Sequence, residues 1–311
     1  MLARTAIGPV IVLLSTLVLP AAANAQLFRA YLAITGNDAN PCTLPQPCRL
    51  LPAALAAVAS GGEIWMLDSA NYNTATVNLA KSVTILAVPG AVGSVVATGG
   101  PAISIATAGL TVTLRNLVIV PLPGAGATDG VRMTQASTLT IEDSLVANLP
   151  GQGVFANAGR LRIVDSAIRG NGIYAVLVQD GAQGVVSGTQ VTDNVYGIAA
   201  LGEANGTTTS VVVRDCLVTG GVIGVAALTT AAAGTRATVT RTTIEQTFYG
   251  VASQTSGGAG SSILIVSDSS VSNSSYAYYQ DGAGSVLKSA GNNLFGDSGL
   301  AVGALTPIAL Q

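Results

Sequence analysis

A short apolar phrase returns about every 22 to 27 residues along the chain and constrains the fold more than any other feature. Its pattern is apolar-x-apolar-x, then Asp, Asn or Gly, then a small polar residue, then x and an aliphatic residue. The copies are Val112–Ile119, Leu139–Val146, Leu161–Ile168, Gly184–Val191, Val211–Val218, Ala237–Ile244, Leu264–Val271 and Leu287–Leu294. One such unit cannot bury its apolar face alone, so neighbouring units must stack. The repeat therefore predicts a solenoid built largely of β-strands.

Alignment of the copies predicts which side chains face the interior. The column two positions before the Asp/Asn/Gly site is apolar and contains Leu114, Ile141, Ile163, Val186, Val213, Val239 and Val266. The column beside it is mixed and contains Thr113, Thr140, Arg162, Val185, Val212, Thr238 and Ile265. Because strand side chains alternate between faces, we expect the first column inside and the second outside.

Two polar columns mark the corner that follows each strand. Ser144, Ser166, Thr189, Cys216, Thr242, Ser269 and Asn292 suggest an internal ladder. Cys216 takes a Ser/Thr place in it, which predicts a buried, inert thiol rather than a nucleophile. The preceding column holds Asp143, Asp165, Asp215 and Asp268, which would either bind cations or form turns. We favour turns, because Gly188 and Arg241 interrupt the column.

Residues 1–25 have the features of a secretory signal peptide. Arg4 provides a positive start, Ile7–Leu19 is apolar, and cleavage is expected near Ala25 and Gln26. A transmembrane anchor is less favoured because the apolar run is short and Pro20 follows it. We therefore expect the mature protein outside the cytoplasm, in the extracellular space, in the periplasm or on the cell surface.

Residues 26–62 are expected to form a lead-in, a disulfide loop and a capping helix. Cys42 and Cys48 flank a loop with two prolines, and a local disulfide is the default in an exported chain. Leu50–Ala59 predicts a helix that ends at Gly61-Gly62 and covers the first coil. Residues 63–311 then form about ten coils, in one domain with the cap. Early coils are expected at Ile64–Leu67, Val83–Leu86 and Ile103–Ile105.

These motifs carry a family resemblance. The phrase Thr113–Ile119 and its Asp-Ser-x-(Ile/Val) successors resemble the right-handed parallel β-helix, pectate-lyase-like superfamily. Gly36–Cys42, Pro47–Arg49 and the following Ala-rich helix resemble the N-terminal region of bacterial secreted members. The resemblance implies the fold but not one activity, since this fold hosts lyases, hydrolases, tailspikes and non-catalytic surface proteins.

The usual catalytic groups of this superfamily are missing from the sequence. Hydrolases that the chain resembles carry an Asp-Asp pair and a histidine, whereas this chain has no such pair and no His. Lyases of the fold use Ca²⁺ with an arginine base, so calcium is possible but unsupported by any motif. The formal net charge is −2, with no basic patch, which argues against a nucleic-acid partner.

Charged residues gather in one part of the repeat. They are Arg115, Arg132, Glu142, Arg160, Arg162 and Arg169. Arg115 and Glu142 share a column on adjacent coils and are expected to form an exposed ion pair. Arg160 and Arg162 should share an outward face, where they either clamp a uronate or sulfate or keep the sheet soluble. With Glu142 they are the catalytic candidates if the protein is a lyase.

A tyrosine column, Tyr174, Tyr196, Tyr249 and Tyr276, is the candidate substrate-binding surface. Facing outward, the rings would form a platform for sugars; facing inward, they would be a core stack, which we favour. Segments Gly202–Thr209, Thr229–Thr235 and Gln254–Ser261 are expected to project as loops from one face.

The sequence thus predicts a secreted β-helix protein that binds extracellular polysaccharide or has a structural role at the surface, with no identifiable catalytic centre. The alternative is a polysaccharide lyase acting on uronate-containing glycans, with an arginine base and with or without calcium. The oligomeric state is left open.

Overall fold

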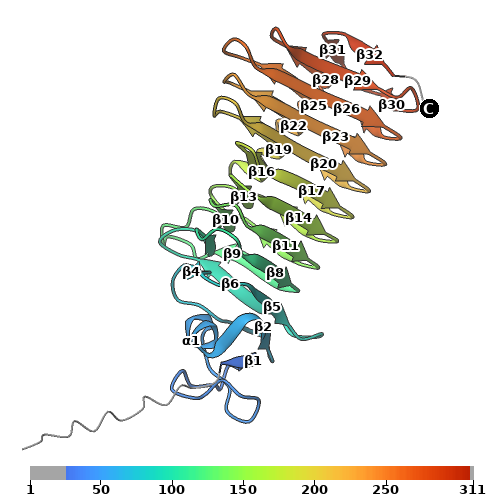
Figure 1. Cartoon of the computed structure of the whole chain (residues 1–311). Helices are drawn as coiled ribbons and strands as arrows, with labels where there is room; N and C mark the ends of the chain where they lie inside the picture. The colour runs from blue at the N-terminus through green and yellow to red at the C-terminus, as the bar shows by residue number, and fades with distance from the viewer. Residues whose placement is uncertain (1–25, 309–311) are drawn as a thin grey trace, which may run out of the picture.

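The computed structural model describes residues 26–308, so the predicted signal peptide lies outside the described residues. The chain winds into a long rod, with its N-terminal part at one end and its C-terminal part at the other (Figure 1). Strands stack coil on coil into three parallel sheets of 12, 10 and 10 strands. We number the sheets 1, 2 and 3 in the order in which each coil passes through them. The predicted all-β parallel solenoid is confirmed.

Sheet 1 contains β1 (Leu27–Leu32), β2 (Val58–Met66), β5 (Val83–Ala87), β8 (Thr111–Arg115), β11 (Thr138–Glu142), β14 (Arg160–Val164), β17 (Gln183–Ser187), β20 (Thr208–Arg214), β23 (Gly234–Thr240), β26 (Ser261–Ser267), β29 (Ser285–Ser289) and β32 (Leu305–Pro307). Sheet 2 contains β3 (Ala70–Asn71), β6 (Gly93–Ala97), β9 (Leu117–Pro121), β12 (Leu145–Ala147), β15 (Ala167–Arg169), β18 (Gln190–Thr192), β21 (Leu217–Thr219), β24 (Thr243–Glu245), β27 (Ser270–Ser272) and β30 (Leu294–Gly296). Sheet 3 contains β4 (Val77–Asn78), β7 (Ile103–Ile105), β10 (Val131–Met133), β13 (Val154–Ala156), β16 (Tyr174–Gln179), β19 (Tyr196–Gly202), β22 (Ile223–Thr229), β25 (Tyr249–Thr255), β28 (Tyr276–Asp281) and β31 (Leu300–Val302).

The interior of the rod follows the predicted columns. Leu114, Ile141 and Ile163 pair across β8, β11 and β14 and are fully buried. Thr113 and Thr140, in the column beside them, are only partly buried, whereas Arg162 is exposed. Each buried aliphatic side chain contributes about 1.5–3 kcal/mol relative to an exposed one. The repeated apolar columns therefore supply the main stabilising contact between coils.

The corner after sheet 1 requires the left-handed backbone conformation, which explains its Asp/Asn/Gly preference. Asp143, Asp165, Asp215 and Asp268 have φ of 49°, 48°, 55° and 49°. Asp and Asn adopt this conformation more readily than most side chains, and glycine does so without a penalty. The aspartates are thus turn residues, as the sequence indicated. Arg241 adopts the same conformation at φ 47° and pairs with Asp215.

The small polar residues beside this corner form the predicted internal ladder. Backbone N–H groups donate to the hydroxyl one coil further on: Leu117 to Ser144 at 3.1 Å and Ser144 to Ser166 at 3.2 Å. One member of the predicted column is wrong: the N–H of Ser269 donates to Asn293, not Asn292. An extra residue in the last corner shifts the register, because Ser270 pairs with Leu294.

The N-terminal end is closed by a short helix and a disulfide loop. Helix α1 spans Leu51–Ala57 and buries Leu51 and Ala54 against the first strands. Its start is fixed by Asp38, whose carboxylate accepts the N–H groups of Arg49 and Leu50 at 2.8 Å each. The predicted Cys42–Cys48 disulfide is present.

The expected glycine stop of this helix is wrong. The chain turns at Val58 and enters β2 directly, so Gly61 and Gly62 lie within a strand. Gly62 lies too close to the Phe28 carbonyl for a side chain, since a Cβ there would be 2.4 Å from that oxygen. No helix within residues 26–308 has the length and apolar character needed to cross a membrane.

The three longer coils extend at the predicted corner mainly as strands rather than as loops, and turns at residues 203–207, 230–233 and 256–260 join the extended strands. Their extra residues lengthen the strands: β19, β22 and β25, like β20, β23 and β26, have seven residues each. Small side chains fill the resulting wedge between sheets 3 and 1. The Ser262 hydroxyl lies 3.1 Å from that of Ser253 and 2.9 Å from that of Thr255. Because the two layers can pair and pack, extension as strands satisfies the backbone better than a loop would.

Candidate functional site

The four tyrosines form one row along the rod. Tyr174 pairs with Tyr196, Tyr196 with Ile223, Ile223 with Tyr249, and Tyr249 with Tyr276, all in sheet 3. The row therefore crosses five coils, with Ile223 in the middle place. All four tyrosine side chains are partly buried.

The tyrosines face outward, so the preferred prediction of a core stack is wrong. Along β19, Ile198 and Ala200 belong to the interior cluster, whereas Ala199 belongs to a separate cluster on the outer face. Tyr174 packs on that outer cluster. The reason is space: a Cβ at Gly250, the residue after Tyr249, would lie 2.3 Å from the Val271 side chain. Aliphatic side chains of sheet 2 fill this corner of the interior and leave no room for rings.

The outward rings pack against one another over a floor of alanines. Ring centroids are 4.9 Å apart for Tyr174 and Tyr196, and 5.1 Å apart for Tyr249 and Tyr276. Tyr279 comes within 4.6 Å of Tyr249. Beneath them lie Ala199, Ala226 and Ala252, each 1% exposed, with Leu201 and Leu228 beside them. We call this surface, the tyrosine row with its alanine floor and flanking leucines, the tyrosine strip.

Burial in the strip affects the pKa of one phenol, that of Tyr174. Desolvation raises the pKa of Tyr174 to about 12, so its hydroxyl stays protonated at ordinary pH. Exposed aliphatic and aromatic side chains border the row: Ile173, Val195, Val222 and Phe248. The Phe248 ring lies 4.7 Å from that of Tyr249 and 5.4 Å from that of Tyr276. The strip is thus an apolar surface that carries phenol hydroxyl groups.

Charged groups lie only at the ends and the far edge of the strip. At one end, Arg132 lies 4.3 Å above the Phe155 ring and pairs with Asp129 at 2.9 Å. At the edge, the Gln179 amide donates to Glu203 at 2.7 Å. Arg132 is therefore ion-paired and Glu203 accepts a hydrogen bond, whereas the row itself contains no charged side chain.

The predicted cluster of charged residues is divided among three sheets. Arg132 lies on sheet 3 and Arg169 on sheet 2, whereas Arg115, Glu142, Arg160 and Arg162 share the outer face of sheet 1. Each coil passes through all three sheets, so arginines that are close in sequence lie on different faces of the rod. The Arg115–Glu142 ion pair is confirmed, with Nε 2.8 Å from the carboxylate. Arg160 and Arg162 are both exposed.

Cys216 occupies the internal ladder as expected. The thiol is buried, and its sulfur lies 3.1 Å from the carbonyl oxygen of Arg214. Desolvation raises the pKa of the Cys216 thiol above its ordinary value. A buried thiol kept protonated in this way is a poor nucleophile.

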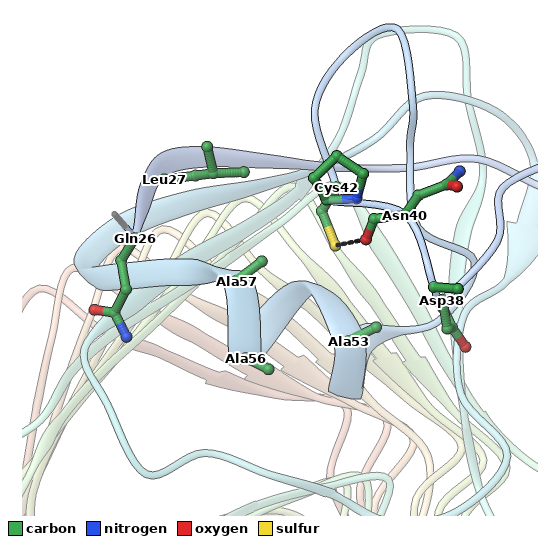
Figure 2. A pocket seen from close by; sticks show the side chains of 10 residues that line it. Gln26, Leu27, Asp38, Asn40, Cys42, Ala53, Ala56 and Ala57 are labelled. Carbon is green, nitrogen blue, oxygen red and sulfur yellow. Dashed lines mark hydrogen bonds between the residues drawn. The ribbon is translucent and has the colours of Figure 1, made fainter. Parts of the chain in front are cut away.

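A pocket of about 550 Å³ lies at the N-terminal cap, between α1 and the disulfide loop. Ala53, Ala56 and Ala57 of the helix line one side, and Asn40 lies across from them (Figure 2). Its polar side chains already serve the cap: Asn40 donates to the Pro47 carbonyl at 2.8 Å, and Asp38 holds the helix start. The pocket is therefore part of the end closure.

No three His, Cys, Asp or Glu side chains within residues 26–308 gather closely enough to hold a metal ion. Calcium remains a prediction attached to the lyase alternative. The sequence analysis missed a second polar ladder, after sheet 2, where the N–H of Leu149 donates to Asn171 and that of Asn171 to Asn194, both at 3.0 Å. An Asn at the same offset in two successive coils was the available signal.

The fold and the outward strip can now be compared with known proteins. The family described as "Right handed beta helix region" matches residues 93–244 and 129–298, more than half of the chain. The chain therefore belongs to the right-handed β-helix family. No curated protein matches it.

Among solved structures, pectate lyase Pel9A is 14% identical with a TM-score of 0.61, over 93% of this chain and 80% of that one. XylC in complex with xylose is 10% identical with a TM-score of 0.61, over 90% and 70%. Tailspike gp49 of Acinetobacter baumannii bacteriophage Fri1, a capsular polysaccharide depolymerase, is 10% identical with a TM-score of 0.51, over 79% and 56%. At these identities the similarity shows the fold alone.

Proposed function

We propose that this chain is an exported β-helix protein that binds an extracellular polysaccharide along the tyrosine strip. The observation that carries the proposal is the outward row of packed rings, which runs along the rod over five coils. A polymer lying along the rod would meet the same type of ring surface on successive coils. The arrangement suits an extended ligand better than a compact one.

The chemistry of the strip fits sugars. Tyrosine combines an apolar ring with a hydroxyl that donates and accepts hydrogen bonds. Sugar rings carry C–H groups on their faces and hydroxyls on their edges, so they can contact both parts. The rings are already packed, at 4.9 Å and 5.1 Å within the two tyrosine pairs, so little side-chain entropy is lost on binding.

The comparisons support a carbohydrate ligand, and the disulfide supports export of the protein. Carbohydrate is the subject of the printed names of structural neighbours, including a pectate lyase and a capsular polysaccharide depolymerase. The Cys42–Cys48 disulfide is typical of proteins in oxidising compartments. Both agree with the export that residues 1–25 predict.

Replacement of the two tyrosine pairs tests the proposal. We expect Tyr174→Ala/Tyr196→Ala and Tyr249→Ala/Tyr276→Ala each to weaken binding about tenfold, equivalent to about 1.4 kcal/mol. A glycan array would identify ligands, and affinity electrophoresis in the matching polymer would measure the loss. Thr238→Ala, on the outer face of sheet 1, is the control, and circular dichroism verifies folding. Unchanged binding after loss of both pairs would exclude the strip as the site.

A lyase is the second candidate, because Arg160 and Arg162 are exposed on one face and the neighbouring pectate lyase shares the fold. Lyase turnover is followed by the absorbance of the unsaturated product on uronate polymers, with and without Ca²⁺. If turnover is observed and Arg160→Gln/Arg162→Gln abolishes it, the protein is a lyase and the binding proposal is rejected. No turnover on any uronate polymer would reject the lyase candidate.

A further inference from the structure

We infer that the outer face of sheet 1 carries a second site, for the acidic group of an anionic polysaccharide, which does not depend on the tyrosine strip. The site consists of Arg160 and Arg162 together with a grid of threonines on the three strands that precede them. It lies on a different sheet from the tyrosines and has the opposite chemistry, because it is polar and positively charged.

The grid follows from the strand register. One column runs through Thr84, Thr113 and Thr140 to Arg162, and a parallel column runs through Thr111 and Thr138 to Arg160. Neighbouring coils are about 4.8 Å apart, and residues two apart on one strand are about 7 Å apart. The two guanidinium groups therefore close one end of a regular array of hydroxyls.

The surface is hollowed along this array. Thr84, Thr113 and Thr140 lie in one depression, with Arg162 at one end and Arg115 and Glu142 at the side. A second, adjoining depression is lined by Thr111, Thr138 and Arg160. Sugar rings placed along the coils would lie in these depressions, with their hydroxyls near those of the threonines.

The polar groups of this face are available. Within the described part of the chain, the hydroxyls of Thr113 and Thr140 make no side-chain hydrogen bond. The acids nearby are neutralised: Glu142 binds Arg115, and Glu63 accepts from Arg29 at 2.7 Å and from the Trp65 indole at 2.9 Å.

Arg160 and Arg162 form no ion pair with any residue in 26–308. Arg115 and Arg29 are paired with glutamates, so the unpaired positive charges that line the two depressions are Arg160 and Arg162. This charge is what favours an acidic ligand over a neutral one, because a guanidinium binds carboxylate, sulfate and phosphate groups through paired N–H donors.

The rest of the same face differs. Beyond Arg162 the column continues through Val185 and Val212, and after Thr238 through Ile265. In this column Val185, Val212 and Ile265 replace the hydroxyls, Thr238 lies between Val212 and Ile265, and a charged side chain returns only at Lys288 of β29. Within residues 26–308, three successive threonines followed by an arginine therefore occur in this column only from β5 to β14, and the proposal rests on this local run.

The test uses Arg160→Gln/Arg162→Gln in the full-length exported protein. The probes are heparin for sulfate, polygalacturonate for carboxylate and a teichoic acid for phosphate, with dextran as the neutral polymer. We expect affinity for at least one anionic probe to fall roughly tenfold or more, and the remaining binding to lose most of its salt dependence. Comparison of the three probes identifies the acidic group.

Arg236→Gln is the matched control. Arg236 is exposed in the same column as Arg160, three strands further along sheet 1, but Ser210 and Thr238 adjoin it in place of a run of threonines. It should leave binding unchanged. An equal loss in this control would show non-specific charge attraction and would overturn the proposal, as would unchanged binding in the double variant.

Two further variants separate the site from folding and from the first proposal. Glu142→Gln removes a negative charge beside the array, so we expect anionic binding to increase about threefold or more, a gain that misfolding cannot cause. Thr113→Val/Thr140→Val keeps the shape of the side chains but removes their hydroxyls, and should weaken binding. Tyr174→Ala/Tyr196→Ala should not affect heparin or polygalacturonate binding to this site, so failure of either proposal leaves the other testable.

Discussion

The outer faces of sheets 1 and 3 are built on the same coils but differ in how their side chains contact one another. On sheet 3, outward side chains pack together, and Ala199, Ala226 and Ala252 are almost completely covered. On sheet 1, outward side chains such as Thr140 and Arg162 stand apart and remain partly or fully accessible. The interior columns fix only the inward positions, so each outer face can acquire its own chemistry.

This difference shows on which face the same side chains contribute to both stability and ligand binding. A change in the tyrosine strip removes contacts within the protein as well as contacts with a ligand. A change in the threonine and arginine array removes only contacts with a ligand. The two faces should therefore respond differently to the same kind of substitution.

The largest difference is expected for truncation of a ring. Tyr249 contacts Phe248, Tyr276 and Tyr279, with centroid distances of 4.7, 5.1 and 4.6 Å. Tyr249→Ala should lower the free energy of unfolding by about 2 kcal/mol, less than for a fully buried ring because the side chain is partly exposed. Thr140→Ala on sheet 1 should stay within about 0.5 kcal/mol of the natural protein. Urea denaturation measures both, and equal losses would refute the distinction between the faces.

The sequence predicted the parts of this comparison that depend on periodicity. Alternation along β8 and β11 identified Leu114 and Ile141 as inward and Thr113 and Thr140 as outward, and the shared corner identified Cys216 as a ladder member. These features repeat in every coil, so each copy supports the others.

The orientation of the tyrosines could not be read in the same way. Strict alternation along β25 would put Tyr249 on the same face as the interior residue Val251. The alternation is interrupted at Gly250, where a Cβ would lie 2.3 Å from the Val271 side chain of sheet 2. That contact joins residues of different strands and leaves no periodic trace in the sequence. The strand extensions could not be predicted for a similar reason. Their small residues are typical of loops, and the pairing between coils that makes them strands leaves no mark in the sequence.

A smaller effect is expected in the wedge that joins the two faces. The Ser262 hydroxyl interacts with those of Ser253 and Thr255 at 3.1 and 2.9 Å, and all three are buried. Ser262→Ala would leave the buried Thr255 hydroxyl without this partner, whereas Ser253 still donates to the Ser262 carbonyl at 3.0 Å, and the change should cost about 1 kcal/mol. Ser267→Ala, at the partly exposed end of the same strand, is the control. Thermal denaturation would detect the loss, and equal melting temperatures for the two variants would show that the wedge does not depend on this network.

The smallest effect is expected at the corner between sheets 1 and 2, where neither face is involved. Arg241 holds the Asp215 carboxylate at 2.7 Å, and this hydrogen bond lowers the pKa of Asp215 below its ordinary value. A carboxyl group whose pKa is lowered on folding stabilises the protein above its unfolded pKa of about 3.9 and loses that contribution as pH falls through the folded value. Both side chains are largely exposed, so the contribution is small and screened by salt. Asp215→Asn should therefore be slightly less stable than the natural protein at neutral pH and low salt, and indistinguishable from it in strong acid. A difference that persists at high salt and low pH would mean that Asp215 does not act through its charge.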